Sequence, residues 1–201
     1  MNATLNGVAI LSLLEPTLVI TELTDCPESQ CRFIQISIAN TVYINVYIHQ
    51  GQLIDSTFYT DKLKFLTVLI SHVRVLLTDG FTVILGGDFN IMPTDADLYN
   101  PDHPDWATHA MVSHRERQLF QAILDLRFHG IVAEKLPHRP YTRWQHYQTA
   151  QDRKTGFRLD YIFTPVLLLS HVQDVKVLTN WRAIDHPSDH APIRIAITHP
   201  L

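Results

Sequence analysis

The chain has 201 residues and a net charge of −4, from 16 Lys and Arg against 20 Asp and Glu. This length suits a single domain, residues 1–201, with a core of useful size. No window approaches 18 uncharged apolar residues, which excludes a transmembrane helix. The N-terminus has no positively charged region before its apolar run, so we expect no secretory signal and a cytoplasmic protein.

The two cysteines, Cys26 and Cys31, fall in one expected loop. Two cysteines without further partners do not make a structural zinc site. They are either thiols or one small disulfide, and thiols fit a reducing compartment better.

The first quarter of the chain is expected to form β-strands joined by short turns. Apolar or alternating stretches predict strands at residues 6–12, 18–23, 31–38 and 41–48. The last of these alternates most clearly, because Val42, Ile44, Val46 and Ile48 fall on one face.

The hydrophobic period then changes to three and four, which predicts a helix over residues 57–77 with Gly80 as a left-handed cap. A buried strand follows at 81–87, and a long polar loop at 88–112. Ser113 and Glu116 have the spacing of a capping box, which begins a second helix. The apolar face of that helix is supplied by Phe120, Ile123, Leu124 and Leu126.

The remainder of the chain is again rich in expected strands. Residues 141–147 and 157–164 predict a strand pair across a basic connection, and residues 172–178 and 193–198 predict two final strands. Strands predominate and do not alternate strictly with helices. The pattern therefore favours an α+β layered domain with a sheet core.

Polar residues recur at or within these strands. They are Tyr47, Asp88, Asn90, Asp160, Asp189 and His190. Asp160 stands in an otherwise apolar strand, and a buried carboxylate is costly without a partner. Each residue alone has a structural explanation. Asp88 can form a turn, and Asp189 with His190 can form another. Asp160 can pair with Arg158 or another base, and Tyr47 can cap the sheet. Together they favour one site, because strand ends can converge on one edge of a core.

Phosphodiester hydrolysis is the chemistry that needs this set of side chains. One carboxylate can bind Mg²⁺ or hold the attacking water, and a second can orient an imidazole. The imidazole and a carboxamide can stabilise charge on the phosphorus oxygens.

Residues 135–158 form a basic segment interleaved with aromatic residues. The basic residues are Lys135, Arg139, Arg143, Arg153, Lys154 and Arg158, against the single acid Asp152. The aromatic residues are Tyr141, Trp144, Tyr147 and Phe157. Such a segment can contact phosphates and stack on bases, although a solvated hairpin with ordinary surface charges has the same composition.

Three motifs carry a resemblance to a known family: Gly86–Asn90, Phe157–Tyr161 and Pro187–Pro192. They resemble the C-terminal motifs of the endonuclease/exonuclease/phosphatase superfamily, in particular exodeoxyribonuclease III and the abasic-site endonucleases. The resemblance implies a DNase I-like, four-layered α/β sandwich of two packed, mainly antiparallel sheets. It also implies a monomer that cleaves double-stranded DNA at abasic sites and 3′ ends, using Mg²⁺ or alternatively Mn²⁺.

The resemblance also implies residue roles. Asp88 would position the water and Asn90 would support the transition state. Asp160 would orient His190 against the scissile phosphate, and Tyr47 would bond that phosphate. The implied metal-binding residues are Asp189, Asp88 and Asn90. The implied DNA-binding residues are Arg143, Trp144, Phe157, Leu159, Arg153 and Lys154.

The chain also departs from the family pattern. The family begins with a strand carrying an Asn and another carrying a metal-ligand Glu in a Gln-Glu motif, and neither is found here. His49 and Gln50 replace a usual Pro-Asn, and Arg143 replaces an aromatic residue. We therefore expect an N-terminally truncated domain that lacks about its first quarter and is weak or inactive as a nuclease. The alternatives are a non-catalytic remnant that binds DNA or a partner, and a phosphoesterase acting on RNA, inositol phosphate or phospholipid.

Overall fold

A computed structural model describes residues 7–26, 31–138, 140–149 and 152–198 of the protein. Its strands are β1 (Leu18–Ile20), β2 (Phe33–Ile38), β3 (Thr41–Tyr47), β4 (Thr82–Asp88), β5 (Phe128–Gly130), β6 (Arg143–Trp144), β7 (Gly156–Phe157), β8 (Asp160–Pro165), β9 (Val172–Val177) and β10 (Ile193–Ile197). The α-helices are α1 (Thr57–Thr78), α2 (His114–Leu124) and α3 (Ile131–Lys135). Short 3₁₀ helices occupy Asp95–Asp97, Pro104–Thr108, Ala110–Val112, Asp152–Lys154, Val166–His171 and Thr179–Ala183.

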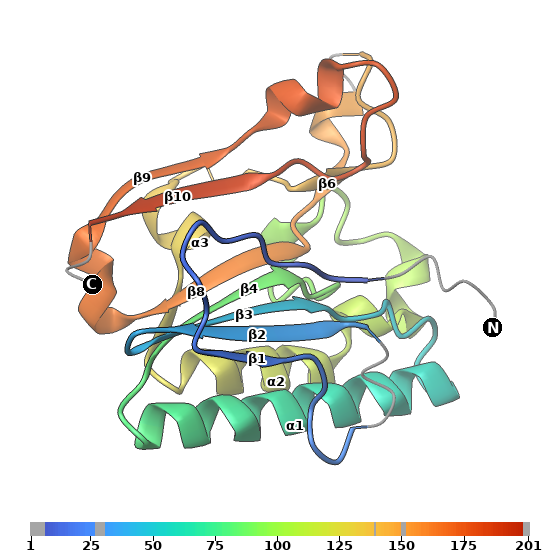
Figure 1. Ribbon diagram of the computed structural model, residues 1–201. Coiled ribbons are helices and arrows are strands. Elements are labelled where there is room, and N and C mark those ends of the chain that lie inside the picture. The colour runs from blue at the N-terminus through green and yellow to red at the C-terminus, as the bar shows by residue number, and fades with distance from the viewer. Residues whose placement is uncertain (1–6, 27–30, 139, 150–151, 199–201) are drawn as a thin grey trace.

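A six-stranded sheet in the order β1-β2-β3-β4-β8-β5 forms the centre of the molecule. Its neighbouring strands are antiparallel except for β3 and β4, which run parallel. A parallel pair needs a crossover, and α1 supplies it. Helices α1 and α2 cover one face of this sheet (Figure 1). The parallel pair brings the C-terminal ends of β3 and β4 to the same edge of the sheet.

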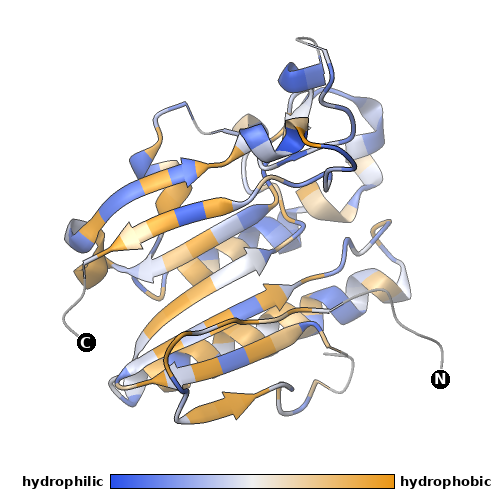
Figure 2. Cartoon of the chain, turned by 45° about the horizontal axis from the view of Figure 1, so that its top comes forward, coloured by the Kyte–Doolittle hydropathy of each residue, from blue (hydrophilic) through white to orange (hydrophobic). Residues whose placement is uncertain are grey.

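Apolar residues dominate the strands of the large sheet (Figure 2). The expected alternation in β3 is confirmed, since Val42, Val46 and Ile48 are at most 1% exposed. They belong to the same core as Leu66 and Leu69 on the inner face of α1. Burial of this face against the helices is the main stabilising contribution that holds the layers together.

The expected helix at 57–77 is also confirmed, and its two ends have clear physical causes. The Ser56 hydroxyl accepts a hydrogen bond from the Tyr59 backbone N–H, which caps the first turn. Beyond the last turn, Gly80 has a φ of +87°, a conformation that would be strained for a residue with a side chain. The expected Gly80 cap thus lies just past the helix, and the chain turns there into β4.

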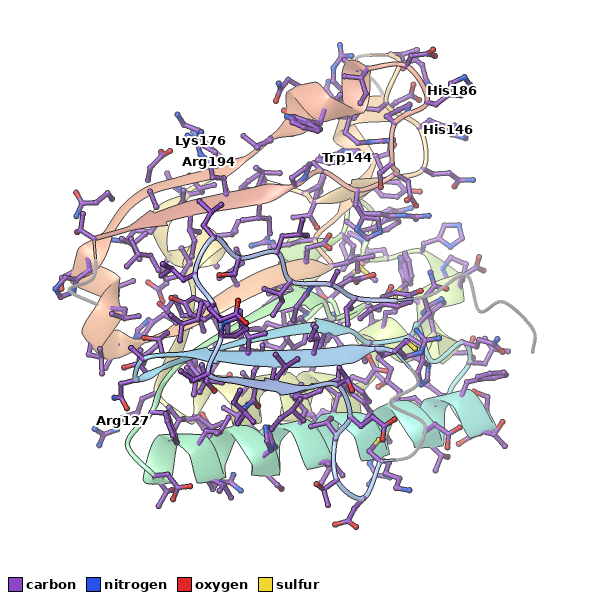
Figure 3. The ribbon with its side chains drawn as sticks, in the orientation of Figure 1. Arg127, Trp144, His146, Lys176, His186 and Arg194 are labelled. Carbon is purple, nitrogen blue, oxygen red and sulfur yellow. The ribbon has the colours of Figure 1, made fainter. Side chains whose placement is uncertain are left out.

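A second, two-stranded antiparallel sheet of β9 and β10 lies over the other face of the large sheet (Figure 1). Val175 and Ile195 pack inward with Ile131 of α3. Lys176 and Arg194 point away from the large sheet, with side chains 58% and 53% exposed (Figure 3). The expected α+β class with two packed, mainly antiparallel sheets is confirmed.

The prediction of a buried strand at residues 6–12 is wrong for the described part, 7–12. These residues form no strand, and the Leu11 side chain is 94% exposed. The described residues place no neighbouring strand alongside this segment, so its backbone has no ladder to join. Asn6 lies outside the described residues. An apolar groove of about 660 Å³ opens between this segment, the large sheet and β10.

The prediction of one strand at 157–164 is also corrected. The short strand β7 pairs with β6, whereas β8 begins at Asp160 and runs between β4 and β5. Arg158, which is 1% exposed, separates the two strands because it turns inward to an ion pair with Asp97 at 2.6 Å. The final strands predicted at 172–178 and 193–198 are confirmed as β9 and β10.

Two smaller predictions concern cysteines and membranes. Cys26 is buried, Cys31 is exposed, and no disulfide joins them. Among the described residues, no helix is long and apolar enough to cross a membrane.

Candidate active site

Three polar residues stand in one row across neighbouring strands of the large sheet. In the strand register, Tyr47 of β3 is opposite Asp88 of β4, and Asp88 is opposite Asp160 of β8. Two carboxylates directly opposite each other on a sheet destabilise it. The row therefore has a cost for folding, which favours a functional reason for it.

Gly87 explains how β4 delivers Asp88 to this row. Its φ is +137°, and a Cβ atom placed there would lie 1.9 Å from the carbonyl oxygen of Val46. Only glycine fits this close approach between β3 and β4. The local sequence thus sets the backbone that carries the first carboxylate.

Asn90 holds the Asp88 carboxylate from two sides. Its backbone N–H donates to Oδ1 at 2.9 Å, and its side-chain Nδ2 donates to Oδ2 at 2.8 Å. The same Nδ2 donates to the carbonyl of Ile48 at 2.8 Å. Asn90 is 3% exposed and has a φ of +51°, which asparagine tolerates better than most residues. The turn after β4 is therefore also the device that fixes Asp88.

The second carboxylate is paired with the imidazole predicted to accompany it. Asp160 Oδ2 lies 2.8 Å from Nδ1 of His190, and both side chains are partly exposed. A histidine whose Nδ1 donates to a carboxylate has its ring orientation and tautomer fixed. The structural alternative, an ion pair between Asp160 and Arg158, is not what the structure has.

Buried Thr142 joins the two segments that carry this pair. Its hydroxyl oxygen accepts hydrogen bonds from the backbone N–H groups of Leu159 and Asp160, at 3.0 and 3.1 Å. Its carbonyl accepts from the N–H of Ala191 at 2.7 Å. Thr142 thereby fixes the start of β8 relative to the segment that holds His190.

The electrostatics of the site follow from its burial and its charges. Burial, and then the negative charge of Asp160, raise the pKa of Asp88 to about 7. Burial alone would lower the pKa of His190, but the hydrogen bond and charge of Asp160 raise it above its ordinary value. The site therefore holds one carboxylate that titrates near neutrality and one stabilised imidazolium.

Asp88, Asp160 and His190 form a possible acidic metal-binding group. One ligand atom from each lies within 4.8 Å of the others. These residues, with Tyr47, line an open pocket of about 500 Å³. Two carboxylates held close in a partly buried site fit a hard divalent cation, because the cation would relieve their mutual repulsion.

The other two predicted metal ligands, Asp189 and Asn90, have protein partners. Asp189 Oδ2 accepts from Nε of Arg143 at 3.0 Å. The Nδ2 of Asn90 is engaged with Ile48 and Asp88, as described above. Metal ligation by either residue stays a prediction.

The predicted DNA-binding residues divide by exposure. Trp144 and Leu159 are buried at 3% and 2% exposure, so they lie beneath the surface. Arg143 stands over the ring of half-buried Phe157, 5.9 Å from its centre. Arg153 and Lys154 are exposed, as is Lys135, whereas Arg139 lies outside the described residues. Figure 3 shows Trp144, which belongs to β6, with His146 and His186 further out.

A buried ion pair beneath the site was not predicted. Lys62 and Glu116 meet at 2.7 Å with fully buried side chains. The sequence does contain a signal, because Lys62 falls on the apolar stripe of α1 with Leu66, Leu69 and Val73. The predicted capping box is only half formed: the Ser113 hydroxyl accepts from the Glu116 N–H, but the Glu116 carboxylate turns to Lys62.

The model of the endonuclease/exonuclease/phosphatase family matches residues 1–190. The chain belongs to this family. Exodeoxyribonuclease III from Haemophilus influenzae is 27% identical over 199 residues, which cover 93% of this chain and 74% of that protein.

Two solved structures are also similar to this chain over most of its length. An AP endonuclease from Archaeoglobus fulgidus is similar with a TM-score of 0.83 and 29% identity, covering 92% of this chain and 72% of that one. A 3′ phosphatase from Neisseria, bound to a product DNA hairpin, is similar with a TM-score of 0.81 and 32% identity, again covering 92% and 72%. The chain is thus an exodeoxyribonuclease III-like phosphodiesterase by resemblance, and the DNase I-like fold is confirmed.

Proposed function

We propose that this family member hydrolyses phosphodiester or phosphomonoester bonds of double-stranded DNA, at abasic sites or 3′ ends, with Mg²⁺. The observation that carries the proposal is the row of Tyr47, Asp88 and Asp160 on three adjacent strands, with His190 bonded to the last. Its relatives supply the substrate class, since they are exonucleases, AP endonucleases and a phosphatase bound to DNA.

Asp88 is the group that handles the water nucleophile. In the metal-free site, burial and Asp160 raise the pKa of Asp88 to about 7. A bound cation would lower this pKa and keep the carboxylate ionised, so that it can orient the water. Hydrogen bonds from Asn90 to both carboxylate oxygens keep the group from rotating. Asp88 and Asp160 would hold Mg²⁺, which when bound neutralises negative charge that develops on phosphate oxygens.

His190 and Tyr47 act on the phosphate itself. Asp160 accepts from Nδ1 of His190, which leaves Nε2 to donate a hydrogen bond to a phosphate oxygen when the ring is protonated. Tyr47 lines the same pocket, and its hydroxyl is a second donor to that oxygen. Arg32 stacks on the Tyr47 ring at 4.7 Å and steadies it.

DNA contacts outside the reacting phosphate fall to the exposed residues of the basic segment. Arg153 and Lys154 are exposed cations that suit a phosphate backbone, and Arg143 with Phe157 presents a mixed basic and aromatic surface. Trp144 and Leu159 support this surface from below, since Trp144 Nε1 donates to the Arg153 carbonyl at 3.2 Å.

A cleavage assay tests the proposal. The purified chain is incubated with an abasic duplex and with a duplex ending in a 3′ phosphate, with Mg²⁺ or with a chelator. We expect products that form slowly, because the Glu ligand of the family pattern is not found in this sequence, and that disappear with the chelator. The absence of products from both duplexes, or equal products with the chelator, would contradict the proposal. Parallel reactions with RNA and an inositol phosphate decide between substrate classes.

Thr142 gives the first residue-level prediction. Thr142→Val keeps the shape of the side chain but removes the acceptor for two backbone N–H groups, and we expect cleavage to fall about tenfold. Thr142→Ser, which keeps the hydroxyl, should restore most of the rate. The measurement is kcat and KM on the abasic duplex.

Thr164 of β8 provides the matched control for this substitution. It is also fully buried, but its hydroxyl finds no hydrogen-bond partner among the described residues. Thr164→Val should therefore leave the rate unchanged. Equal losses in the two valine variants would show that burial of a threonine, and not the bonds of Thr142, matters.

A further inference from the structure

The buried side chain of Lys62 is the strongest feature that the proposed mechanism does not use. An ammonium group removed from water has a large desolvation penalty unless it is paired and hydrogen-bonded. Lys62 is 0% exposed, and burial lowers its pKa while Glu116 opposes the shift. A position that keeps a charge in an otherwise apolar core needs a reason beyond packing.

The ammonium of Lys62 makes three hydrogen bonds, which use all its protons. It donates to Glu116 Oε2 at 2.7 Å, to the Asn90 carbonyl at 2.8 Å and to the Gln50 carbonyl at 3.2 Å. Two of the three acceptors are therefore backbone groups in loops, and the carboxylate of Glu116 balances the charge.

Those two loops are the ones that leave the sheet at the candidate active site. Gln50 follows β3, which ends at Tyr47, and Asn90 follows β4, which ends at Asp88. Because β3 and β4 are parallel, both loops leave the same edge, and Lys62 joins them from below.

The contact with Asn90 bears directly on the carboxylate. Asn90 fixes both oxygens of Asp88 through its N–H and its side chain, in a left-handed backbone conformation with φ +51°. Lys62 holds the carbonyl of that same residue. The chain from Lys62 through Asn90 to Asp88 is thus a continuous series of short hydrogen bonds.

The surroundings leave this arrangement little freedom. A Cβ atom on Gly51 would come within 3.0 Å of Lys62 Cδ and 3.4 Å of Glu116 Oε1. Glu116 is fixed in turn, because its N–H is bonded to Ser113, and the same Ser113 hydroxyl accepts from Tyr59 of α1. The ammonium therefore has one position available to it.

We propose that Lys62 is a positioning residue, whose buried ammonium, balanced by Glu116, fixes Asn90 and thereby aims Asp88 for phosphodiester cleavage. The proposal rests on the proposed function. A displacement of about 1 Å at a reacting group can cost about 10²-fold in rate. Loss of the contact should therefore lower kcat more than it raises KM.

The test compares variants that separate the charge pair from the contact with Asn90. Glu116→Gln keeps the Lys62 side chain beside Asn90 but leaves its charge without a counter-charge, so its Tm should fall more than that of the double variant and its kcat less. Lys62→Met with Glu116→Leu replaces the pair by apolar groups, which often restores folding. This double variant should regain a near wild-type Tm, yet keep a kcat about 10- to 100-fold lower with KM little changed. Lys64→Met, on the exposed side of α1, is the matched control.

A second readout does not depend on cleavage. The Asn90 side-chain amide is assigned by its absence from an NMR spectrum of Asn90→Asp. Its hydrogen exchange should accelerate in the double variant and not in Lys64→Met. If the wild-type chain cleaves nothing, the proposed function fails, and this exchange still decides whether Lys62 fixes Asn90. A double variant with wild-type kcat, or with unchanged Asn90 exchange, would overturn the proposal, as would equal kcat losses in Glu116→Gln and the double variant.

Discussion

Replacing Asp88 with asparagine is expected to lower the cleavage rate by about 10³-fold or more. The substitution keeps the size and shape of the side chain. One of the two Asn90 donors still has an oxygen to bond, and the other faces the new NH2 group. It removes the negative charge that would hold Mg²⁺ and the base that titrates near neutrality. Measured kcat on the abasic duplex at saturating Mg²⁺ gives the result.

The same substitution is expected to raise the Tm of the metal-free protein near pH 8. Burial and the charge of Asp160 raise the pKa of Asp88 to about 7, above its value in the unfolded chain. When an acidic group has a higher pKa in the folded than in the unfolded protein, the protein becomes less stable as the pH rises from the unfolded pKa to the folded pKa. The amide of the Asp88→Asn variant has no charge to bury, and near pH 8 this gain in stability should exceed the loss of one hydrogen bond from Asn90.

The exposed Asp79, just beyond α1, is the control for this carboxylate. Asp79→Asn should leave the rate unchanged and change the Tm by much less than Asp88→Asn, because Asp79 lies outside the site at the exposed C-terminal end of α1. A variant at Asp88 that keeps more than about a tenth of the wild-type rate would remove Asp88 from the mechanism. A falling Tm at pH 8 would contradict the electrostatic account of the site.

The positions of the candidate active-site residues could be predicted because they depend on strand ends. Tyr47 closes an alternating strand and Asp88 closes an apolar one, whereas Asp160, which was predicted inside a strand at 157–164, opens β8. Local sequence patterns report these positions well, since a period of two is set by the backbone. The row across β3, β4 and β8 follows once the strands pair, although the pairing itself involves residues far apart in sequence.

The partners of these polar groups could not be predicted, because they depend on three-dimensional packing. Arg158 was a reasonable partner for Asp160 by proximity in sequence, yet the strand break between β7 and β8 turns it to Asp97. Arg143 and Asp189 lie 46 positions apart and meet only because β6 lies beside the 189–191 segment. Similarly, Glu116 has a capping-box spacing, but Lys62 is the stronger partner for a buried carboxylate.

The segment at residues 7–12 shows the opposite failure. Its apolar composition fits a strand, but a strand needs a neighbour to accept its hydrogen bonds. The described residues offer one such bond, from the Val8 N–H to the Cys31 carbonyl, and no ladder. The prediction failed because composition indicates a strand without showing whether a partner strand is present.

Replacing Asp160 with asparagine is expected to lower kcat by about 10²- to 10³-fold and to move the whole pH profile toward lower pH. Asp160 fixes His190 through the 2.8 Å bond to Nδ1, and its charge would help to hold Mg²⁺. The amide of asparagine can still contact Nδ1 but supplies no charge. The loss should therefore fall mainly on kcat.

The direction of the pH shift follows from two pKa values. In the wild type, the bond and charge of Asp160 raise the pKa of His190 against the effect of burial, so its imidazolium persists to higher pH. The alkaline limb of the pH–rate profile therefore lies at a higher pH. Asp160 also contributes, after burial, to the raised pKa of Asp88 in the metal-free site, and the acid limb follows the ionisation of Asp88. Removal of one negative charge lowers both pKa values, so both limbs move in the same direction.

The profile of kcat/KM from about pH 5 to 10 measures this shift, since it reports the acid and base of the free enzyme. Asp174→Asn is the control, because Asp174 is a carboxylate on the second sheet that pairs with Arg194. It should leave the rate and both limbs in place. An Asp160→Asn profile that falls in height without moving would assign Asp160 to holding the cation alone. A profile that moves toward higher pH would contradict the coupling between Asp160, His190 and Asp88.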